Sequence, residues 1–227
     1  MAGLHVRRWG AGDRVAVLVH GMTTDSGSWW RVGPALADRG YRVLAPDLPG
    51  HGRSPRAPEY TLRAMGTAVA DAVPARPALA IGHSLGGLVV AATVDRLKPA
   101  RAVYVDPPWG PPPGPEVAAY LRTQPEWTLD QLAAFHPRWP AEAVREKHAA
   151  LSRWDPRTLQ VVRDYPGPRH RTVPSLVVAA ELESMIDDTL AERLRAEGLP
   201  VRRVAGTGHV VHNDDVDGFL SALDGWL

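Results

Sequence analysis

The sequence predicts an α/β fold in which a mostly parallel central sheet is covered by helices on both faces. Continuously apolar, β-branched runs such as residues 15–19 are typical of strands that are buried on both sides. These runs alternate with helical segments of about 10 to 13 residues, an order that favours parallel strands joined by helices. A chain of 227 residues is long enough for one large domain with an insertion.

The expected elements follow in order, and turn residues set several of their limits. Gly40 and Gly198 end two of the helices, and Pro74 breaks a third, because neither residue type continues a helix well. We expect strands at residues 4–9, 14–19, 41–46, 79–81, 102–106, 174–180 and 201–204, and helices at about 28–39, 61–73, 87–97, 188–197 and from 214 or 215 to 227.

The alternation stops after residue 106, where prolines at 107–108 and 111–113 make a stiff exit from the strand. The next strand follows only about 60 residues later, and the segment between has its own helix-start signals. These are Thr128 with Gln131, Pro140, and Asp155 with Pro156. We therefore expect residues 107–172 to form a small helical lid, inserted before the last two strands into a core domain of residues 1–106 and 173–227.

The composition limits the classes of function. The net charge is +1 and neither half carries a basic block, so we expect no nucleic acid or membrane partner. The absence of cysteine excludes disulfides and thiolate sites and suits the cytoplasm. No apolar span of 18 residues occurs, and residues 1–10 lack a signal-peptide core, so we expect a soluble cytoplasmic protein. The sequence leaves its oligomeric state open.

The segment Gly82-His83-Ser84-Leu85-Gly86 has the pattern of a sharp turn from a strand into a helix. Such a turn is strained, and a Cβ at either glycine would collide with it. The turn lifts the Ser84 hydroxyl clear of the sheet. It also places the N–H of Leu85 at a helix start, where amides can hold negative charge.

Four motifs in this order resemble the α/β-hydrolase family, in its lid-bearing branch of esterases and lactonases. They are His20-Gly21, the octapeptide 47–54, the Ser84 pentapeptide and Gly208-His209. The resemblance covers residues from about 13 to the end but not the lid. Each motif follows an expected strand, and ligands of parallel sheets bind at that edge.

A serine hydroxyl needs a base, and His209 is the expected one. It follows the last strand, and Gly206 and Gly208 give its loop freedom to approach Ser84. His212 is a second candidate base. We expect His83 to point away along the turn and to serve in packing.

The imidazole needs a carboxylate to fix its tautomer. By resemblance, the usual acid follows the strand before that of the histidine, which selects Glu183 although this chain has glutamate where the family has aspartate. The alternative is Asp106, a position used by some family members, and Asp187 or Glu181 remain possible. The first assignment predicts that Glu183→Gln lowers activity about a hundredfold or more and Asp106→Asn far less.

The resemblance implies an oxyanion hole made of the backbone amides of Met22 and Leu85, each worth about 3 kcal/mol in the transition state. His20, Gly21 and Trp109 are expected at the substrate pocket, and Trp109 is favoured because it closely follows residue 106. An aromatic wall suggests a moderately apolar substrate.

The sequence thus predicts a serine hydrolase that cleaves a carboxylic ester or lactone of a small molecule through an acyl-enzyme, with no metal or organic cofactor. Ser84 counts against haloalkane dehalogenase and epoxide hydrolase chemistry, which by resemblance uses aspartate at this turn. A lyase or cyclase acting on a secondary metabolite with the same residues is the alternative. A ligand-binding relative without activity is a further one.

Overall fold

The structure, a computed structural model, describes residues 3–110, 114–164 and 172–227, without the side chains of 162–164. In this part of the chain seven strands form one sheet in the order β1-β3-β2-β4-β5-β6-β7. All neighbours pair in parallel except β1, which is antiparallel to β3. The strands are β1 Val6–Trp9, β2 Arg14–Val19, β3 Tyr41–Pro46, β4 Leu79–His83, β5 Ala102–Val105, β6 Ser175–Ala180 and β7 Val201–Val204.

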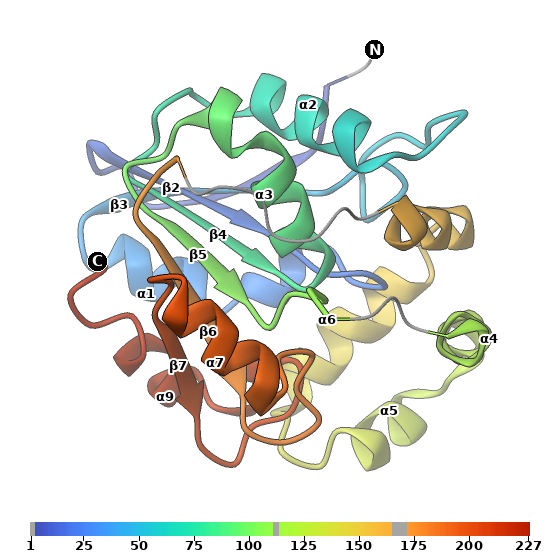
Figure 1. Ribbon diagram of the computed structural model, residues 1–227. Coiled ribbons are helices and arrows are strands. Elements are labelled where there is room, and N and C mark those ends of the chain that lie inside the picture. The colour runs from blue at the N-terminus through green and yellow to red at the C-terminus, as the bar shows by residue number, and fades with distance from the viewer. Residues whose placement is uncertain (1–2, 111–113, 165–171) are drawn as a thin grey trace.

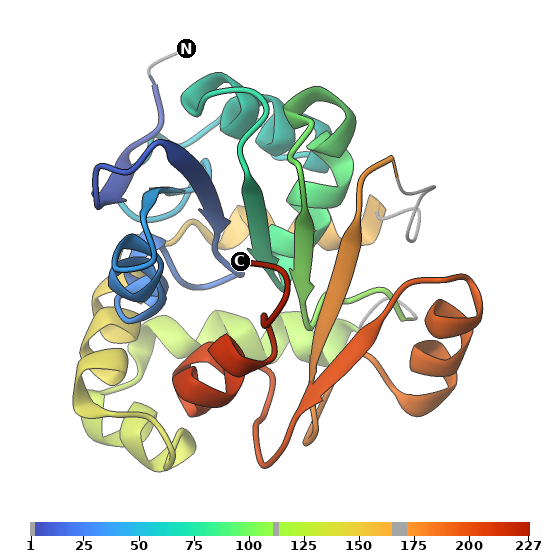
Figure 2. The same ribbon diagram turned by 90° about the vertical axis from the view of Figure 1, so that its left-hand side faces the viewer.

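Helices cover both faces of the sheet, as the alternation of apolar runs and helices predicts (Figures 1 and 2). One face packs against α2 (Leu62–Ala72), α3 (Leu85–Leu97) and α7 (Asp188–Ala196). The other face packs against α1 (Val32–Ala37) and α9 (Val216–Ser221). The α/β prediction is therefore confirmed.

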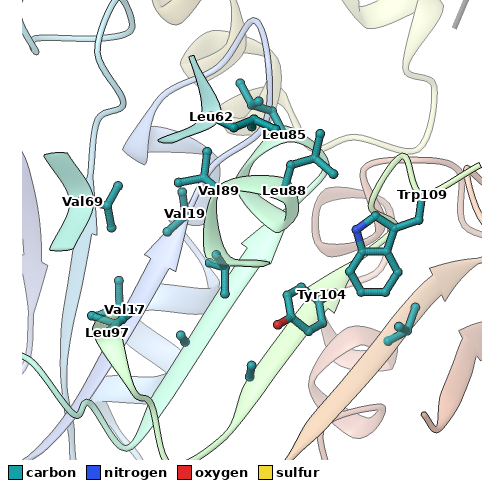
Figure 3. Packing of buried hydrophobic residues seen from close by; sticks show 14 of the residues in the cluster. Val17, Val19, Leu62, Val69, Leu85, Leu88, Val89, Leu97, Tyr104 and Trp109 are labelled. Carbon is teal, nitrogen blue, oxygen red and sulfur yellow. The ribbon is translucent and has the colours of Figure 1, made fainter. Parts of the chain in front are cut away.

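The core on the first face surrounds α3. Figure 3 shows Val89 and Leu97 of this helix with Val19 and Val17 of β2, all in one buried apolar cluster. Side chains on both α3 and β2 are almost completely shielded from solvent, and such burial is the main force that holds a helix on a sheet. The turn between β4 and α3 is thereby fixed between two packed elements.

Two helix predictions differ from the structure. The segment 28–39 is a 3₁₀ turn, η1 (Ser26–Trp29), followed by α1, because Pro34 has no N–H to reach back to residue 30. The last helix, α9, follows the short helix α8 (Val211–Asp214) and starts as expected after its N-cap Asp215, but it ends at residue 221 instead of 227. Just beyond this end, the guanidinium of Arg202 donates to the backbone carbonyls of residues 222 and 224, each at 2.8 Å, and Gly225 has a left-handed backbone at φ 79°.

Between β5 and β6 the chain forms a helical insertion. Its elements are α4 (Pro115–Thr123), η2 (Gln124–Glu126), α5 (Leu129–Phe135), α6 (Ala141–Leu151) and η3 (Pro156–Asp164). The capping box at the start of α5 is present: Gln131 N donates to Thr128 Oγ1 at 3.2 Å, and Thr128 N donates to Gln131 Oε1 at 2.8 Å. Figures 1 and 2 place the insertion beyond the carboxyl ends of the parallel strands. The expected proline exit at 111–113 lies outside the described residues.

Polar contacts tie the insertion to the core. Arg153 forms an ion pair with Asp25 at 2.7 Å, and the hydroxyl of Tyr60 donates to Asp155 Oδ2 at 2.8 Å. Asp155 also accepts from the side chain and the backbone N–H of Arg157. Burial alone would raise the pKa of Asp155, but the hydrogen bonds from Arg157 and Tyr60 lower it to about 2.

The low pKa of Asp155 predicts that its contribution to the free energy of unfolding depends on pH. Its folded pKa of about 2 lies below the unfolded value of about 3.9, so its contribution is present above about pH 4 and is lost as the pH falls towards 2. Asp155→Asn should therefore lower the free energy of unfolding by about 1 to 2 kcal/mol at pH 6, and by about half as much at pH 3. Urea unfolding at both values measures the difference.

The exposed Asp13 provides the matched control, since Asp13→Asn should change stability by less than about 0.5 kcal/mol. An equally large loss of unfolding free energy in Asp155→Asn at pH 6 and at pH 3 would contradict this prediction. Such a loss would arise from packing and not from the ionised carboxylate.

Among the helices of the described residues, none combines the length and the apolar character needed to cross a lipid bilayer.

Candidate active site

Ser84 occupies a strained turn at the carboxyl end of β4. Its backbone has φ 51° and ψ −118°, a region that residues with a Cβ rarely adopt, and its N–H donates to Val105 O at 2.9 Å. A Cβ on Gly82 would lie 2.3 Å from the carbonyl oxygen of Gly86. The two glycines therefore allow the close approach that the turn requires, for the steric reason that the sequence pattern suggests.

His209 and Asp106 complete a chain of hydrogen bonds with Ser84. Nε2 of His209 lies 3.0 Å from Ser84 Oγ, and Nδ1 lies 2.7 Å from Asp106 Oδ2. An ionised carboxylate only accepts hydrogen bonds, so Nδ1 carries the proton and Nε2 accepts from the serine hydroxyl. The three groups come from the ends of β4, β5 and β7. This arrangement can activate a hydroxyl as a nucleophile.

Asp106 is fully buried, and several donors surround it besides His209. Ser184 Oγ donates to Oδ1 at 2.5 Å, Met185 N donates to Oδ2 at 3.0 Å, and Ala180 N lies 3.3 Å from Oδ1. Burial alone would raise the pKa of Asp106, but the hydrogen bond and charge of His209, with the bond from Ser184, hold it below its usual value. The carboxylate is therefore ionised where it faces the imidazole.

The structure does not place Glu183 against His209, so this part of the sequence prediction is wrong about the geometry. Glu183 is exposed, with a left-handed backbone at φ 50°. The loop that carries it bonds to the loop after β7, from Leu182 N to Thr207 O at 2.8 Å. The position beside the imidazole is occupied by Asp106, the alternative assignment.

The other two acidic candidates also have different partners. Glu181 accepts from Gly206 N at 2.8 Å, and Asp187 caps α7 by accepting from Leu190 N at 2.7 Å. Both carboxylates organise loops around the site and neither contacts the imidazole.

Two further histidines lie near the site. His83 Nε2 donates to the backbone oxygen of His209 at 3.0 Å, a positioning contact that the sequence did not indicate, because it joins residues 126 positions apart. Burial, and next the charge of His209, lower the pKa of His83 well below its ordinary value. His212 stacks on Trp29, with ring centroids 4.3 Å apart, and is not the partner of Ser84.

Two of the expected pocket residues lie elsewhere. His20 is fully buried; its Nδ1 donates to Gly21 O at 2.8 Å, and its Nε2 accepts from Leu48 N at 2.9 Å. Trp109 packs in the core, 4.8 Å from the ring of Tyr104 (Figure 3). A tight turn, with Trp109 N bonded to the oxygen of residue 107 at 2.8 Å, explains why this indole returns to the core and does not line the cavity.

Gly21 does not line the cavity, but its backbone lies close to Ser84 and His83. A Cβ at this position would lie 2.8 Å from His83 Nδ1 and 3.3 Å from Ser84 Cβ. The next residue, Met22, does line the cavity. Gly21 therefore brings the backbone of this loop close to Ser84.

A cavity of about 580 Å³ opens over Ser84 and His209. The insertion supplies much of its wall, through Val117, Tyr120, Leu121, Phe135, Trp139 and Ala143. Small-molecule sites are typically mostly apolar cavities with a few placed polar groups. In the described residues no group of three or more His, Asp or Glu side chains is placed to hold a metal ion.

Lys147, from α6, is a cavity residue that the sequence did not single out. Its Nζ donates to Thr23 O at 3.1 Å and to Thr23 Oγ1 at 2.5 Å, and burial lowers its pKa to about 7. Thr23 follows Met22 and has a left-handed backbone at φ 57°. The one available signal was rarity, because only Lys98 and Lys147 are lysines among 26 basic residues.

Comparisons with known proteins bear on the family of the chain. The model of the alpha/beta hydrolase family matches residues 16–222. Pimeloyl-[acyl-carrier protein] methyl ester esterase of Methylococcus capsulatus is 45% identical over 87 residues, which cover 38% of this chain and 33% of that protein. Lipase LipV of Mycobacterium tuberculosis is 38% identical over 112 residues, 46% of this chain and 41% of the lipase. The aligned part therefore spans well under half of each of these relatives.

The crystal structure of E-2-(acetamidomethylene)succinate hydrolase superimposes with a TM-score of 0.82 at 22% identity, covering 98% of this chain and 94% of that one. At this identity the likeness concerns the fold. It extends over nearly the whole chain, whereas the sequence matches to the two curated relatives are local.

Proposed function

The chain belongs to the alpha/beta hydrolase family, and from this premise we propose that it is a serine hydrolase that cleaves a carboxylic ester or lactone of a small molecule. The observation that carries the proposal is the continuous hydrogen-bonded chain Ser84–His209–Asp106, with distances of 3.0 and 2.7 Å. Its two relatives above are named as a methyl ester esterase and a lipase, and both names agree with ester hydrolysis.

In the proposed reaction His209 takes the proton of Ser84 as the oxygen attacks the substrate carbonyl. Asp106 then faces an imidazolium, which its ionised carboxylate stabilises. His209 passes the proton to the leaving alkoxide, which leaves an acyl group on Ser84. The same imidazole activates a water molecule that releases the acid and restores the serine.

The negative oxygen that forms during the attack needs hydrogen-bond donors, and we assign this role to the backbone amides of Met22 and Leu85. Leu85 is the first residue of α3, so its N–H has no acceptor within the helix and lies at the positive end of the helix dipole. Met22 lies on the neighbouring loop, next to Gly21, which approaches Ser84.

We further propose that residues 107–172 act as a lid over the site. Its described helices α4, α5 and α6 all contribute side chains to the cavity wall, among them Tyr120, Phe135 and Ala143. The apolar character of these side chains supports a moderately apolar substrate. The remainder of the chain, 1–106 and 173–227, supplies the sheet and the reacting groups.

The test is covalent labelling together with a substrate panel. A fluorophosphonate probe should label the protein at Ser84 and fail to label Ser84→Ala, while Ser221→Ala, at an exposed serine, should react like the unmodified chain. p-Nitrophenyl esters of increasing length and several lactones should be hydrolysed only when Ser84 is present. In isotopically labelled water the product acid should carry the label.

Two results would contradict the proposal. One is the absence of both labelling and ester cleavage above the Ser84→Ala background. The other is turnover in which the product takes no oxygen from water, since this would indicate a lyase or cyclase.

A further inference from the structure

Lys147 presents a positive charge to the cavity without an opposite charge beside it. An ammonium group has three N–H donors, and two of them are used by the uncharged oxygens of Thr23 at 3.1 and 2.5 Å. Among the residues that the structure describes, no carboxylate forms an ion pair with Lys147. One N–H donor of the ammonium therefore stays available to a molecule that enters the cavity.

Among the described residues, the other charged groups of the cavity are not paired with this ammonium. Arg138 is paired with Asp214 at 3.3 Å, so these two cavity residues neutralise each other. His136 stays neutral, because burial, with a smaller effect of the Lys147 charge, lowers its pKa to about 3. Glu183 lies at an exposed position on the cavity wall. Lys147 is half-buried, and a bound anion would stabilise its charged form.

We propose that Lys147 is a specificity-determining residue that binds a carboxylate of the substrate, so that the preferred substrate is a small ester carrying a free carboxylate group. This rests on the proposed function, because Lys147 and Ser84 line one cavity. The apolar side chains of the cavity wall suit the methylene chain of such a half-ester. The carboxylate would accept the third N–H of Lys147 in a charge-assisted hydrogen bond.

The contacts of Lys147 with Thr23 allow a competing explanation, in which the lysine only holds the loop that carries Met22. The two roles have different consequences. A structural tether affects the cleavage of every substrate alike, whereas charge recognition changes the ratio between anionic and neutral substrates. The experiment is therefore designed to measure this ratio.

The substrates are monomethyl esters of linear dicarboxylic acids, compared with the dimethyl esters of the same acids. Both contain the same scissile bond, and only the monomethyl ester carries a carboxylate. In the unmodified chain the ratio of kcat/KM, monoester to diester, should exceed about 10 at the optimal chain length. In Lys147→Met the ratio should fall about 30-fold, and in Lys147→Arg it should stay within about threefold.

Arg145→Met is the matched control, because it removes a positive charge from the exposed side of the same helix. It should leave the ratio unchanged within about twofold, since exposed charges are screened by salt.

Product inhibition needs no variant at residue 147. A dicarboxylate should inhibit the unmodified chain at least about tenfold more strongly than the monocarboxylate of equal length.

Three results would overturn the inference: no preference for monoesters at any length, equal losses on both ester types in Lys147→Met, or equal inhibition by both acids. Each of these leaves ester hydrolysis itself in place. If no ester is cleaved and Ser84 is not labelled, the proposed function fails instead. Calorimetric binding of a monomethyl ester, tighter to the unmodified chain than to Lys147→Met, then supports the inference by itself, and equal binding refutes it.

Discussion

Asp106→Asn is expected to lower kcat for ester hydrolysis by about 10³ to 10⁴-fold. The asparagine amide can donate to Nδ1 of His209, which moves the ring proton to Nε2. In that tautomer Nε2 cannot accept the proton of Ser84, to which it lies 3.0 Å away. The variant also lacks a negative charge to stabilise the imidazolium. Steady-state kinetics with a p-nitrophenyl ester measures the loss.

Glu183→Gln is the matched control and should lower kcat less than about tenfold, because Glu183 is exposed and has no bond to the imidazole. Thermal unfolding of both variants separates an effect on catalysis from one on folding, since Asp106 also accepts from Ser184 and Met185. A larger loss in Glu183→Gln than in Asp106→Asn would return the acid role to Glu183.

Gly86→Ala is expected to destabilise the protein by about 3 kcal/mol or more, although alanine is favoured over glycine in a helix by about 1 kcal/mol. A Cβ at Gly86 would lie 2.1 Å from Val19 O and 2.6 Å from His20 O. Both atoms belong to the backbone and cannot rotate away, so α3 must move from β2. For a chain of this size, the midpoint of thermal unfolding should fall by roughly 6 to 12 °C.

Gly3→Ala is the control for this prediction, because no atom lies within 4 Å of a Cβ at Gly3. Its unfolding midpoint should stay within about 1 °C of the unmodified chain. If Gly86→Ala unfolds at the same temperature as Gly3→Ala, the turn at Ser84 is not held by the close contact described here.

Most of the sheet could be predicted from the sequence because buried parallel strands are marked by local composition. The limits of β2, β3 and β7 agree with the expected ranges 14–19, 41–46 and 201–204. Helix ends were harder to predict. Just beyond the end of α9, carbonyls accept from Arg202, which lies about 20 residues earlier in the chain, and a local pattern does not contain such a contact.

In the candidate site, too, features set by neighbouring residues could be predicted, and features set by long-range contacts could not. The strained turn at Ser84 is specified by the glycines around it, so it could be predicted. The choice between Glu183 and Asp106 depended on the direction of a loop, which long-range hydrogen bonds to Thr207 and Asp106 determine. Trp109 was misplaced for a related reason, because its position follows from a turn at the end of β5.

Asp106 receives hydrogen bonds from the chain that follows β6 as well as from His209, which comes after β7. During synthesis, the chain that follows β6 can thus donate hydrogen bonds to the buried carboxylate of Asp106 before His209 has emerged from the ribosome. The proton acceptor of Ser84, His209, follows β7, which pairs at the edge of the sheet. The nascent polypeptide therefore gains its proposed reactivity only after His209 has been made and placed, 125 residues after the serine itself.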